Sequence, residues 1–363
     1  MTNLRVNTIR SGDGNNGPIF EGNLSFSSTS HIVLPKGTTA ERPVGISTGA
    51  LRYNTETGQV EYYNGIDWIS TSSYDGSIRG VFGGGSSTQT NIIEYVSINN
   101  LSNSTDFGDL TVARNELGAC SSSTRGVFGG GNTPTTVNVM DYITILTTGN
   151  AVDFGDLTLA RYYVSACSSN IRGIFAGSNI SASNVIDFIT IATTGNATDF
   201  GDLTVARGGI GACSSSTRGV FGGGYSPTRT NTIDYITIAT EGNAIDFGDL
   251  SVTRNSLRAC SSSTRGVFGG GATGSGPSNV IDYITIATTG NATDFGDLTE
   301  ARFGLEACSS STRGVFGGGS NPADFNTLDY ITIASIGNAT DFGDLSLSRR
   351  GLAACSNAHG GLS

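Results

Sequence analysis

The sequence predicts an all-β fold built from a repeated unit, and three observations lead to that class. Close variants of the motif Arg-Gly-Val-Phe-Gly-Gly-Gly occur six times at spacings of 46 to 48 residues, beginning at Arg79, Arg125, Arg172, Arg218, Arg265 and Arg313. Within each copy, short runs rich in Ile, Val, Phe, Tyr and Thr alternate with Gly, Asn and Ser. The repeats show no helical period, so the runs are typical of strands and the breaks of turns.

Each repeat contains four runs of strand character. In the copy that includes Arg125, we expect strands over residues 117–122, 125–130, 140–146 and 151–157. Four antiparallel strands in a unit of this length are typical of one blade of a β-propeller. A β-helix rung would be much shorter, and a leucine-rich or ankyrin repeat would contain helix. The small residues of Ala119-Cys120-Ser121 suit the crowded innermost strand of such a blade, and glycine in the second strand allows a neighbouring blade to approach closely.

The ends of the repeat region predict how the blades close. Residues 349–356 repeat the inner-strand pattern at the end of the chain, whereas no proper inner strand precedes Arg79. We therefore expect the last strand, residues 352–357, to complete the first blade and to give a six-bladed ring. This organisation predicts two domains, a β-rich region over residues 1–70 and the propeller over residues 71–363.

The repeats resemble the kelch family of propellers. That family has a glycine pair at the end of the second strand, an aromatic residue in each of the next two strands, and an arginine that opens the following blade. Gly83-Gly84, Tyr95, Phe107 and Arg114 occupy these positions in the first repeat, with equivalents in the others. One departure is Phe107, where the family usually has tryptophan. The resemblance covers about 280 residues and implies a divergent, kelch-like propeller.

All length variation among the repeats falls in one window, between the glycines and the third strand. The spacing is constant elsewhere, for instance from Tyr95 to Phe107 and from Phe107 to Arg114. In an antiparallel blade this loop and the connection to the next blade open on the same face, and loops on a rigid scaffold commonly carry recognition. They could also be merely tolerant loops. The candidate binding residues are Gln89, Thr135, Tyr225, Arg229, Asp324 and Phe325.

Residues 1–70 do not share the repeat. Leu34-Pro-Lys-Gly-Thr-Thr-Ala-Glu-Arg-Pro43, Leu51-Arg-Tyr-Asn-Thr55 and Glu61-Tyr-Tyr-Asn-Gly65 followed by Trp68 resemble segments of fibre and appendage proteins of tailed bacteriophages. The stretch from 49 to 68 predicts a three-stranded β-meander. The resemblance implies attachment to other virion proteins and a homo-oligomer, with a trimer as one form. A meander of this size buries too little surface to be stable alone.

Composition and charge disfavour several other classes. The net charge of −10 and the single lysine, Lys36, argue against nucleic-acid binding. No apolar run has the roughly 20 residues that a membrane helix needs, and no secretory leader opens the sequence. The only histidines, His31 and His359, lie outside the regular repeats, so we expect no catalytic site, no metal site and no cofactor.

The repeated cysteines and charges favour structural roles. One cysteine stands at the same position of each repeat (Cys120, Cys167, Cys213, Cys260, Cys308 and Cys355), so blade spacing holds the thiols beyond disulfide reach. We expect small buried thiols. The Asp-Phe-Gly-Asp motif, such as Asp106 with Asp109, could bind calcium, but we favour turn capping and pairing with a repeated arginine. Likewise we expect Arg114 and Arg125 to pair with aspartates.

These observations favour a structural protein of a phage virion, a tail fibre or another appendage. It would attach through residues 1–70 and display the propeller to a host surface glycan or protein, or to a neighbouring virion protein. The alternative from another class is a cellular or secreted propeller lectin or adhesin, which the absence of a leader disfavours. An enzyme is the least favoured reading.

Overall fold

The structure, a computed structural model, describes residues 34–56, 59–63, 65, 67–70, 78–86, 88–178 and 183–362. The chain divides into two compact units, Met1–Gly76 and Ser77–Ser363, and each is considered by itself. The described residues form strands and two short 3-10 turns, which confirms the predicted all-β class. None of the helical segments in these residues is long and apolar enough to cross a lipid bilayer.

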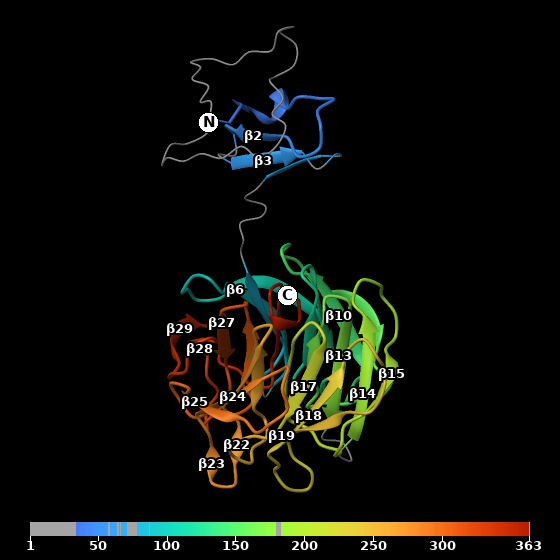
Figure 1. Ribbon diagram of the computed structural model, residues 1–363, viewed down its shortest axis with the longest axis vertical. Helices are drawn as coiled ribbons and strands as arrows, with labels where there is room; N and C mark the ends of the chain where they lie inside the picture. Colours follow the sequence, from blue (N-terminus) through green and yellow to red (C-terminus); the bar gives the residue numbers. More distant parts are fainter. Residues whose placement is uncertain are drawn as a thin grey trace, which may run out of the picture. The chain divides into compact units, whose positions relative to one another are not determined.

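Six four-stranded antiparallel sheets, named sheets I to VI, make up the described part of the larger unit (Figure 1). Their strands, from the inner strand outward, are as follows. Sheet I contains β30 (Ala353–Ser356), β5 (Arg79–Gly83), β6 (Thr90–Ser97) and β7 (Thr105–Arg114); sheet II contains β8 (Gly118–Ser121), β9 (Arg125–Gly129), β10 (Val139–Thr144) and β11 (Val152–Asp156). Sheet III contains β12 (Ser165–Ser168), β13 (Arg172–Ser178), β14 (Ser183–Thr190) and β15 (Thr198–Asp202).

The other three sheets follow the same order. Sheet IV contains β16 (Gly211–Ser214), β17 (Arg218–Gly222), β18 (Thr232–Thr237) and β19 (Ile245–Asp249); sheet V contains β20 (Arg258–Ser261), β21 (Arg265–Gly269), β24 (Val280–Thr285) and β25 (Thr293–Asp297). Sheet VI contains β26 (Glu306–Ser309), β27 (Arg313–Gly317), β28 (Thr327–Thr332) and β29 (Thr340–Asp344). A small ribbon of β22 (Ala272–Thr273) and β23 (Gly276–Pro277) lies in the loop of sheet V. The four predicted runs in each repeat therefore match strands.

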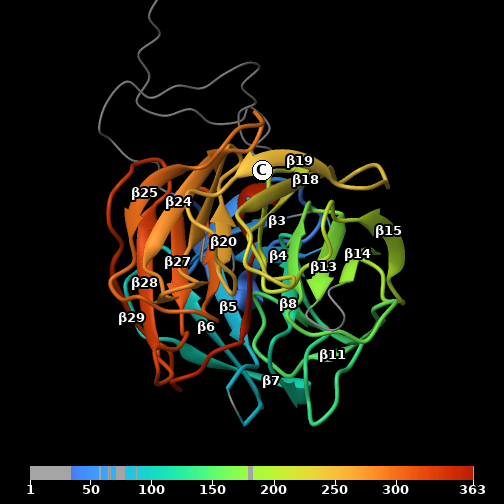
Figure 2. The same cartoon turned by 90° about the horizontal axis from the view of Figure 1, so that it is seen from below.

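The sheets are arranged in a propeller-like manner. Each inner strand contacts the inner strand of the next sheet, and β30 contacts both β26 and β8. In Figure 2 the strands β5, β8 and β20 lie toward the middle of the unit, and β7, β15 and β29 lie toward its rim. Sheet I combines the first repeat with the end of the chain, because β30 pairs with β5 in antiparallel register, Cys355 opposite Val81.

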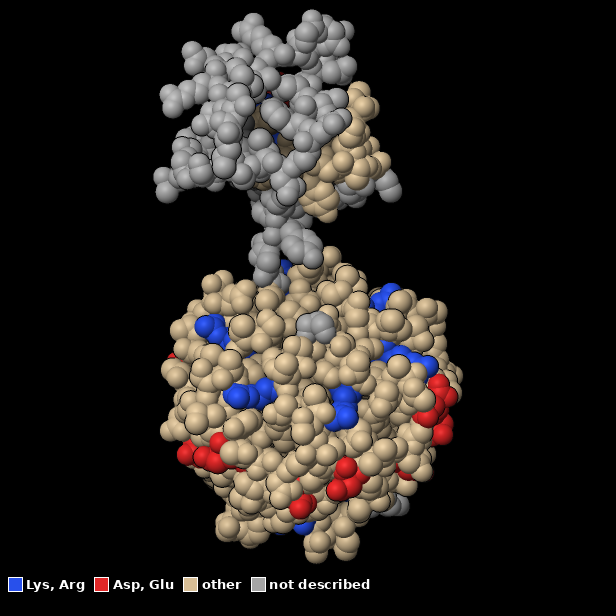
Figure 3. All heavy atoms as spheres, viewed as in Figure 1, with Lys and Arg blue, Asp and Glu red and all other residues tan. Residues whose placement is uncertain are grey.

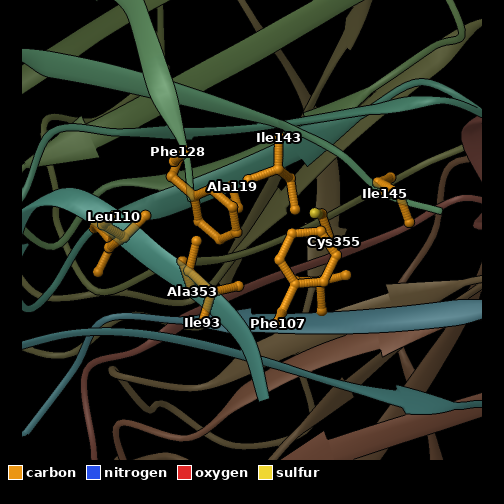
Figure 4. Close-up of a cluster of buried hydrophobic side chains, with 12 residues drawn as sticks. Ile93, Phe107, Leu110, Ala119, Phe128, Ile143, Ile145, Ala353 and Cys355 are labelled. Carbon is orange, nitrogen blue, oxygen red and sulfur yellow. The ribbon is translucent and has the colours of Figure 1, made fainter. Parts of the chain in front are cut away.

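Apolar side chains from facing sheets form the core. Between sheets I and II, the buried cluster includes Ile93, Phe107, Phe128, Ile143 and Cys355 (Figure 4). Phe128 is fully buried and Phe107 is 2 % exposed. Burial of one such side chain contributes about 1.5–3 kcal/mol, and the same cluster recurs between the other sheets. The core therefore lies between sheets rather than inside any one of them.

Glycine in the second strand makes the close packing possible. A Cβ atom on Gly314 of β27 would lie 2.5 Å from Sγ of Cys260 on β20, in the preceding sheet. Each of the six cysteines lies against the equivalent glycine of the following sheet. All six are free and buried, which confirms the prediction of small buried thiols. A side chain at the glycine would push neighbouring sheets apart.

Two sets of polar contacts tie each sheet to the next. A serine at the end of each inner strand donates its hydroxyl hydrogen to the carbonyl of the serine in the preceding sheet, at 2.6–2.8 Å, and Ser121 donates to Ser356 O. Near the outer strands, buried arginines pair with carboxylates of the following sheet. These pairs are Arg114–Asp141, Arg161–Asp187, Arg207–Asp234, Arg254–Asp282, Arg302–Asp329 and Arg349–Glu94. Both sets run through every sheet and return to the first.

The chain end packs against the inner strands. The turn η2 (Gly360–Leu362) contacts β12, β16 and β20. Nδ1 of His359 accepts a hydrogen bond from Gly361 N at 3.1 Å, so Nε2 carries the ring proton and donates it to Ser121 O at 3.1 Å. Desolvation lowers the pKa of His359 to about 4, which keeps the ring neutral at neutral pH.

The described residues of the smaller unit form one four-stranded sheet. Its strands β2 (Leu51–Asn54), β3 (Gln59–Tyr63) and β4 (Trp68–Ser70) form an antiparallel meander, as predicted, and β1 (Lys36–Gly37) pairs with β2 in parallel. The turn η1 (Thr39–Glu41) follows β1.

The two faces of this sheet differ in chemistry. On one face Arg52, Asn54 and Glu61 are buried, and Asn54 Nδ2 donates a hydrogen bond to Glu61 Oε1 at 2.8 Å. On the other face Leu51 is 50 % exposed and Tyr53 is 39 % exposed. The unit thus holds its strands together with polar contacts and leaves apolar side chains on its surface.

Candidate functional site: the loop face of the larger unit

The loops after the second strands pair with the connections between sheets. Isolated antiparallel bridges join Asn115 to Asn132, Gly208 to Tyr225, Asn255 to Ala272 and Phe303 to Ser320. In each bridge the first residue belongs to the connection entering a sheet and the second to the loop of that sheet. The prediction that both open on the same face is confirmed, and we call this surface the loop face.

Six residues at the inner edge of the loop face form a hydrogen-bonded circle that we call the collar. The backbone N–H of each donates to the carbonyl of the collar residue in the preceding sheet, at 2.6–3.3 Å, and all six have φ between 53° and 65°. The collar consists of Glu116, Tyr163, Gly209, Ser256, Gly304 and Gly351. Only glycine adopts this left-handed conformation freely, so Glu116, Tyr163 and Ser256 are each strained by about 1 kcal/mol or more.

The collar carries ionisable side chains that are not repeated around the unit. Glu116 is only 9 % exposed, and its Oε2 atom has no hydrogen-bond partner among the described residues. Burial raises the pKa of Glu116 to about 7, against the opposing effect of Arg258 and Arg350. Arg258 itself is buried and pairs with Glu306 at 2.7 Å. This charged group breaks the six-fold sequence pattern at the centre of the loop face.

A polar pocket lies beside the collar. It has a volume of about 310 Å³ and is lined by Tyr163, Gly208, Gly209, Tyr225, Arg229 and Asn255. Two of the predicted binding residues, Tyr225 and Arg229, are therefore brought together, and an isolated bridge joins them across their loop. We call it the Tyr225 pocket. Its volume is at the lower end of the range typical of small-molecule sites, on the order of 300–1,000 Å³.

Two of the residues that line the pocket, Gly208 and Gly209, have no side chain. Gly208 and Gly209 occupy the positions that hold Asn115 and Glu116 in the connection entering sheet II. At the first of these positions the other sheets carry Tyr162, Asn255, Phe303 and Arg350. Among the six connections, glycine stands at this first position only in the one entering sheet IV.

The other predicted binding residues lie in loops of other sheets and do not line the Tyr225 pocket. Gln89, in sheet I, is half-buried with a left-handed φ of 52°. Thr135, in sheet II, is exposed. In sheet VI, Asp324 Oδ1 lies 3.8 Å from Arg350 Nε, and Phe325 N donates to the carbonyl of Gly319. In sheet III the variable window between the second and third strands, expected over residues 178–183, falls mostly on residues 179–182, which lie outside the described residues.

One expectation for the repeated aspartates is wrong. Among the described residues, neither Asp106 nor Asp109 forms an ion pair, and the arginines pair instead with the aspartate of the third strand, such as Asp141. Asp109 N donates to Asn150 Oδ1 of the next sheet at 3.1 Å. The third-strand carboxylate is fully buried and must be neutralised, whereas Asp106 is exposed and remains solvated.

The expectation for the arginines is half right. Arg114 pairs with Asp141 as predicted, at 2.8 Å. Arg125 has no carboxylate partner among the described residues and lies 4.3 Å from the centre of the Tyr142 ring, with Nη1 donating to Ile191 O at 2.9 Å. A cation over an aromatic face needs no carboxylate.

The middle of the unit offers little room for a ligand. A cavity of about 50 Å³ is lined by the Ala, Cys and Ser residues of the inner strands and by His359. That is space for one or a few water molecules. In the part of the chain that the structure describes, no three His, Cys, Asp or Glu side chains are grouped so that they could hold a metal ion.

Sequence reasoning missed the collar and the two glycines of the pocket. A signal was present, because the two residues after each repeated arginine vary freely although the spacing around them is constant.

No model of a protein family matches the chain, and no curated protein sequence matches it either. The assignment of the candidate site therefore rests on the positions of its residues in the structure.

Proposed function

We propose that the protein is a non-enzymatic structural protein of a tailed-phage virion that displays a recognition surface on a rigid frame. The observation that carries the proposal is the loop face. Strand positions and inter-sheet contacts repeat in every sheet, whereas the length variation falls in the loops of the loop face, where the unrepeated groups Glu116, Tyr225 and Arg229 also lie. Variable loops on a constant frame are the arrangement expected of a binding scaffold.

We further infer that the frame is a closed, six-bladed, kelch-like propeller. Three circles support this: the serine hydroxyl bonds, the buried arginine–carboxylate pairs and the collar all pass through the six sheets and return to sheet I. The pairing of β30 with β5 supplies the inner strand of the first blade from the other end of the chain. Such closure removes exposed sheet edges.

The smaller unit suits attachment to other virion proteins and self-association. Its apolar side chains Leu51 and Tyr53 point to the surface while polar groups fill the opposite face. Contact with a second copy, in a trimer for example, or with a larger assembly would cover that apolar surface and supply the burial that a small sheet lacks. The phage-like motifs around Leu34–Pro43 and Trp68 lie in the same unit.

Mass spectrometry of purified phage particles tests the virion assignment. Peptides of the chain in stoichiometric amounts are expected, and their absence from particles that carry the gene would exclude this role. The alternative, a cellular lectin or adhesin, predicts the protein in the cell envelope or medium and not in particles.

Adsorption competition tests the recognition role. Recombinant full-length protein, added to host cells before the phage, is expected to slow adsorption in proportion to its concentration. Unchanged adsorption at saturating protein would favour a connecting or decorative role in the particle over receptor binding.

A further inference from the structure

One cation of the loop face has no structural counter-charge. In the described part of the larger unit, six arginines form the buried pairs between sheets, and six more lie 4.2–4.6 Å over aromatic rings. Arg258 pairs with Glu306, and Arg350 lies 3.8 Å from Asp324. Among these residues, only Arg229 has neither a carboxylate nor a ring as partner. The charge of Arg229 is thus not balanced by a carboxylate or a ring of the described residues.

The guanidinium of Arg229 is held in place by a neutral group. Its Nε atom donates a hydrogen bond to Asn255 Oδ1 at 2.9 Å. This contact fixes the orientation of the side chain and leaves the Nη1 and Nη2 atoms as donors. Two parallel N–H donors of a guanidinium match the two oxygens of a carboxylate. No acidic side chain lines the Tyr225 pocket to compete for them.

The rest of the pocket favours a sugar ring over a peptide or a bare anion. Tyr163 and Tyr225 line the pocket, Tyr225 with 40 % of its surface exposed, and the Asn255 amide oxygen accepts the hydrogen bond from Arg229. Aromatic faces pack against the C–H face of a pyranose, and the polar atoms meet its hydroxyl groups. The pocket is a short hollow of about 310 Å³ bounded by the loop of sheet IV, not an extended groove.

We propose that the Tyr225 pocket binds a saccharide that carries a carboxylate, of the uronic acid class, with Arg229 on the carboxylate and the tyrosines against the ring. This inference rests on the proposed function and deepens it, because it names the chemistry that the loop face recognises.

Calorimetric titration of the full-length protein with D-glucuronate, D-glucose and acetate tests the proposal. Glucuronate is expected to bind more tightly than both of the others, since glucose lacks the carboxylate and acetate lacks the ring. Arg229→Gln is expected to lower the affinity for glucuronate by roughly tenfold or more, the usual effect of losing a charge-assisted bidentate contact, and to leave glucose unaffected.

A second variant probes the hollow itself. Tyr225→Ala removes an aromatic ring that lines the pocket, at a loop position that is 40 % exposed, so the fold is expected to tolerate it. It is expected to weaken the binding of glucuronate and of glucose alike, whereas Arg229→Gln weakens only the binding of glucuronate. Lys36→Gln, which removes one exposed cation from the other unit, is the charge-matched control and should bind like the wild type.

Three results would overturn the proposal: no binding of glucuronate by the wild type, equal binding by Arg229→Gln, or acetate binding as tightly as glucuronate. The adsorption competition, run with the same preparations, separates this from the proposed function. Wild-type protein that slows adsorption but ignores glucuronate would remove the saccharide assignment and leave receptor binding intact.

Discussion

Glu116 has a carboxyl group whose pKa lies above the ordinary value for a glutamate. Its carboxyl is buried in the collar in a left-handed conformation, and one of its oxygens lacks a partner among the described residues. Arg258, Arg350, Tyr163 and Glu306 are the charged and titratable groups that act on it. Because burial outweighs the two arginines, its pKa is about 7 instead of 4.5.

This residue makes stability depend on pH. The folded state holds the proton of Glu116 more tightly than the unfolded state does, so its contribution is complete below pH 4.5 and is lost as the pH rises through about 7. The shift corresponds to about 3 kcal/mol. Glu116→Gln is expected to remove this loss and to be more stable than the wild type above pH 7.

Chemical denaturation at a series of pH values measures the effect. Glu300→Gln, at an exposed position, is the control and should keep the wild-type profile. A Glu116→Gln profile parallel to that of the wild type would contradict the assignment.

Contacts between neighbouring sheets are set by one cysteine and one glycine. With a Cβ atom only 2.5 Å from Cys260 Sγ, Gly314→Ala is expected to destabilise the protein by about 1–3 kcal/mol. Cys260→Ala should relieve most of this overlap, so the double variant should be more stable than the sum of the single effects predicts. A coupling of about 0.5–3 kcal/mol in a thermal or denaturant cycle is expected.

The control for this cycle is Gly274→Ala. A Cβ atom on Gly274 would meet nothing within 4 Å, so that variant should unfold like the wild type. Strictly additive effects of Gly314→Ala and Cys260→Ala would show that the contact between Gly314 and Cys260 does not limit how closely the two sheets pack.

The buried ion pairs also join neighbouring sheets. Arg161 on the connection that leaves sheet II and Asp187 on β14 are both fully buried and 2.8 Å apart, and Thr158 Oγ1 also donates to Asp187 at 2.6 Å. Asp187→Ala leaves the buried guanidinium of Arg161 without its carboxylate partner and is expected to lower the free energy of unfolding by about 3–5 kcal/mol. Glu241→Ala breaks the exposed pair with Arg172 and should cost less than about 1 kcal/mol. Equal losses in equilibrium unfolding would contradict the role of burial.

At the scale of the whole molecule, the last strand decides whether the larger unit is complete. Truncation after Gly351 removes β30, and with it the inner strand of sheet I, the Ser356 contacts on both sides and the packing of Leu352. Such a chain is expected to lose cooperative thermal unfolding and to aggregate. Truncation after Asn357 keeps β30, removes only the turn with His359, and should still unfold cooperatively. A chain ending at Gly351 that unfolds like the wild type would refute this account.

Much of this architecture follows from regular features of the sequence. The strand positions, the buried thiols around Cys120 and the pairing of Arg114 could be predicted, because each is repeated six times at fixed spacing and repetition averages out local ambiguity. The partner of Arg125 could not, since tyrosine and aspartate follow each other in the same strand and only the side-chain direction decides between them.

The candidate site was only half predictable for a related reason. Tyr225 and Arg229 stand in a window whose length varies, which draws attention to them. The collar residue Glu116 and the hollow at Gly208 depend on substitutions at constant length. The burial of Glu116 and the hollow at Gly208 depend on residues of the neighbouring sheets, which cannot be identified from the sequence of a single repeat.

The strand that follows the link between the units has a mechanical consequence. β5 is hydrogen-bonded along both edges, to β30 on one side and to β6 on the other, and Arg79 N also donates to Asn357 Oδ1 at 2.9 Å. On the face of this unit that Figure 3 shows, Lys and Arg side chains and Asp and Glu side chains form small separate groups. A pulling force applied to the chain before β5 would have to break the hydrogen bonds to β30 and to β6 at the same time. We therefore expect β5 to resist mechanical unfolding.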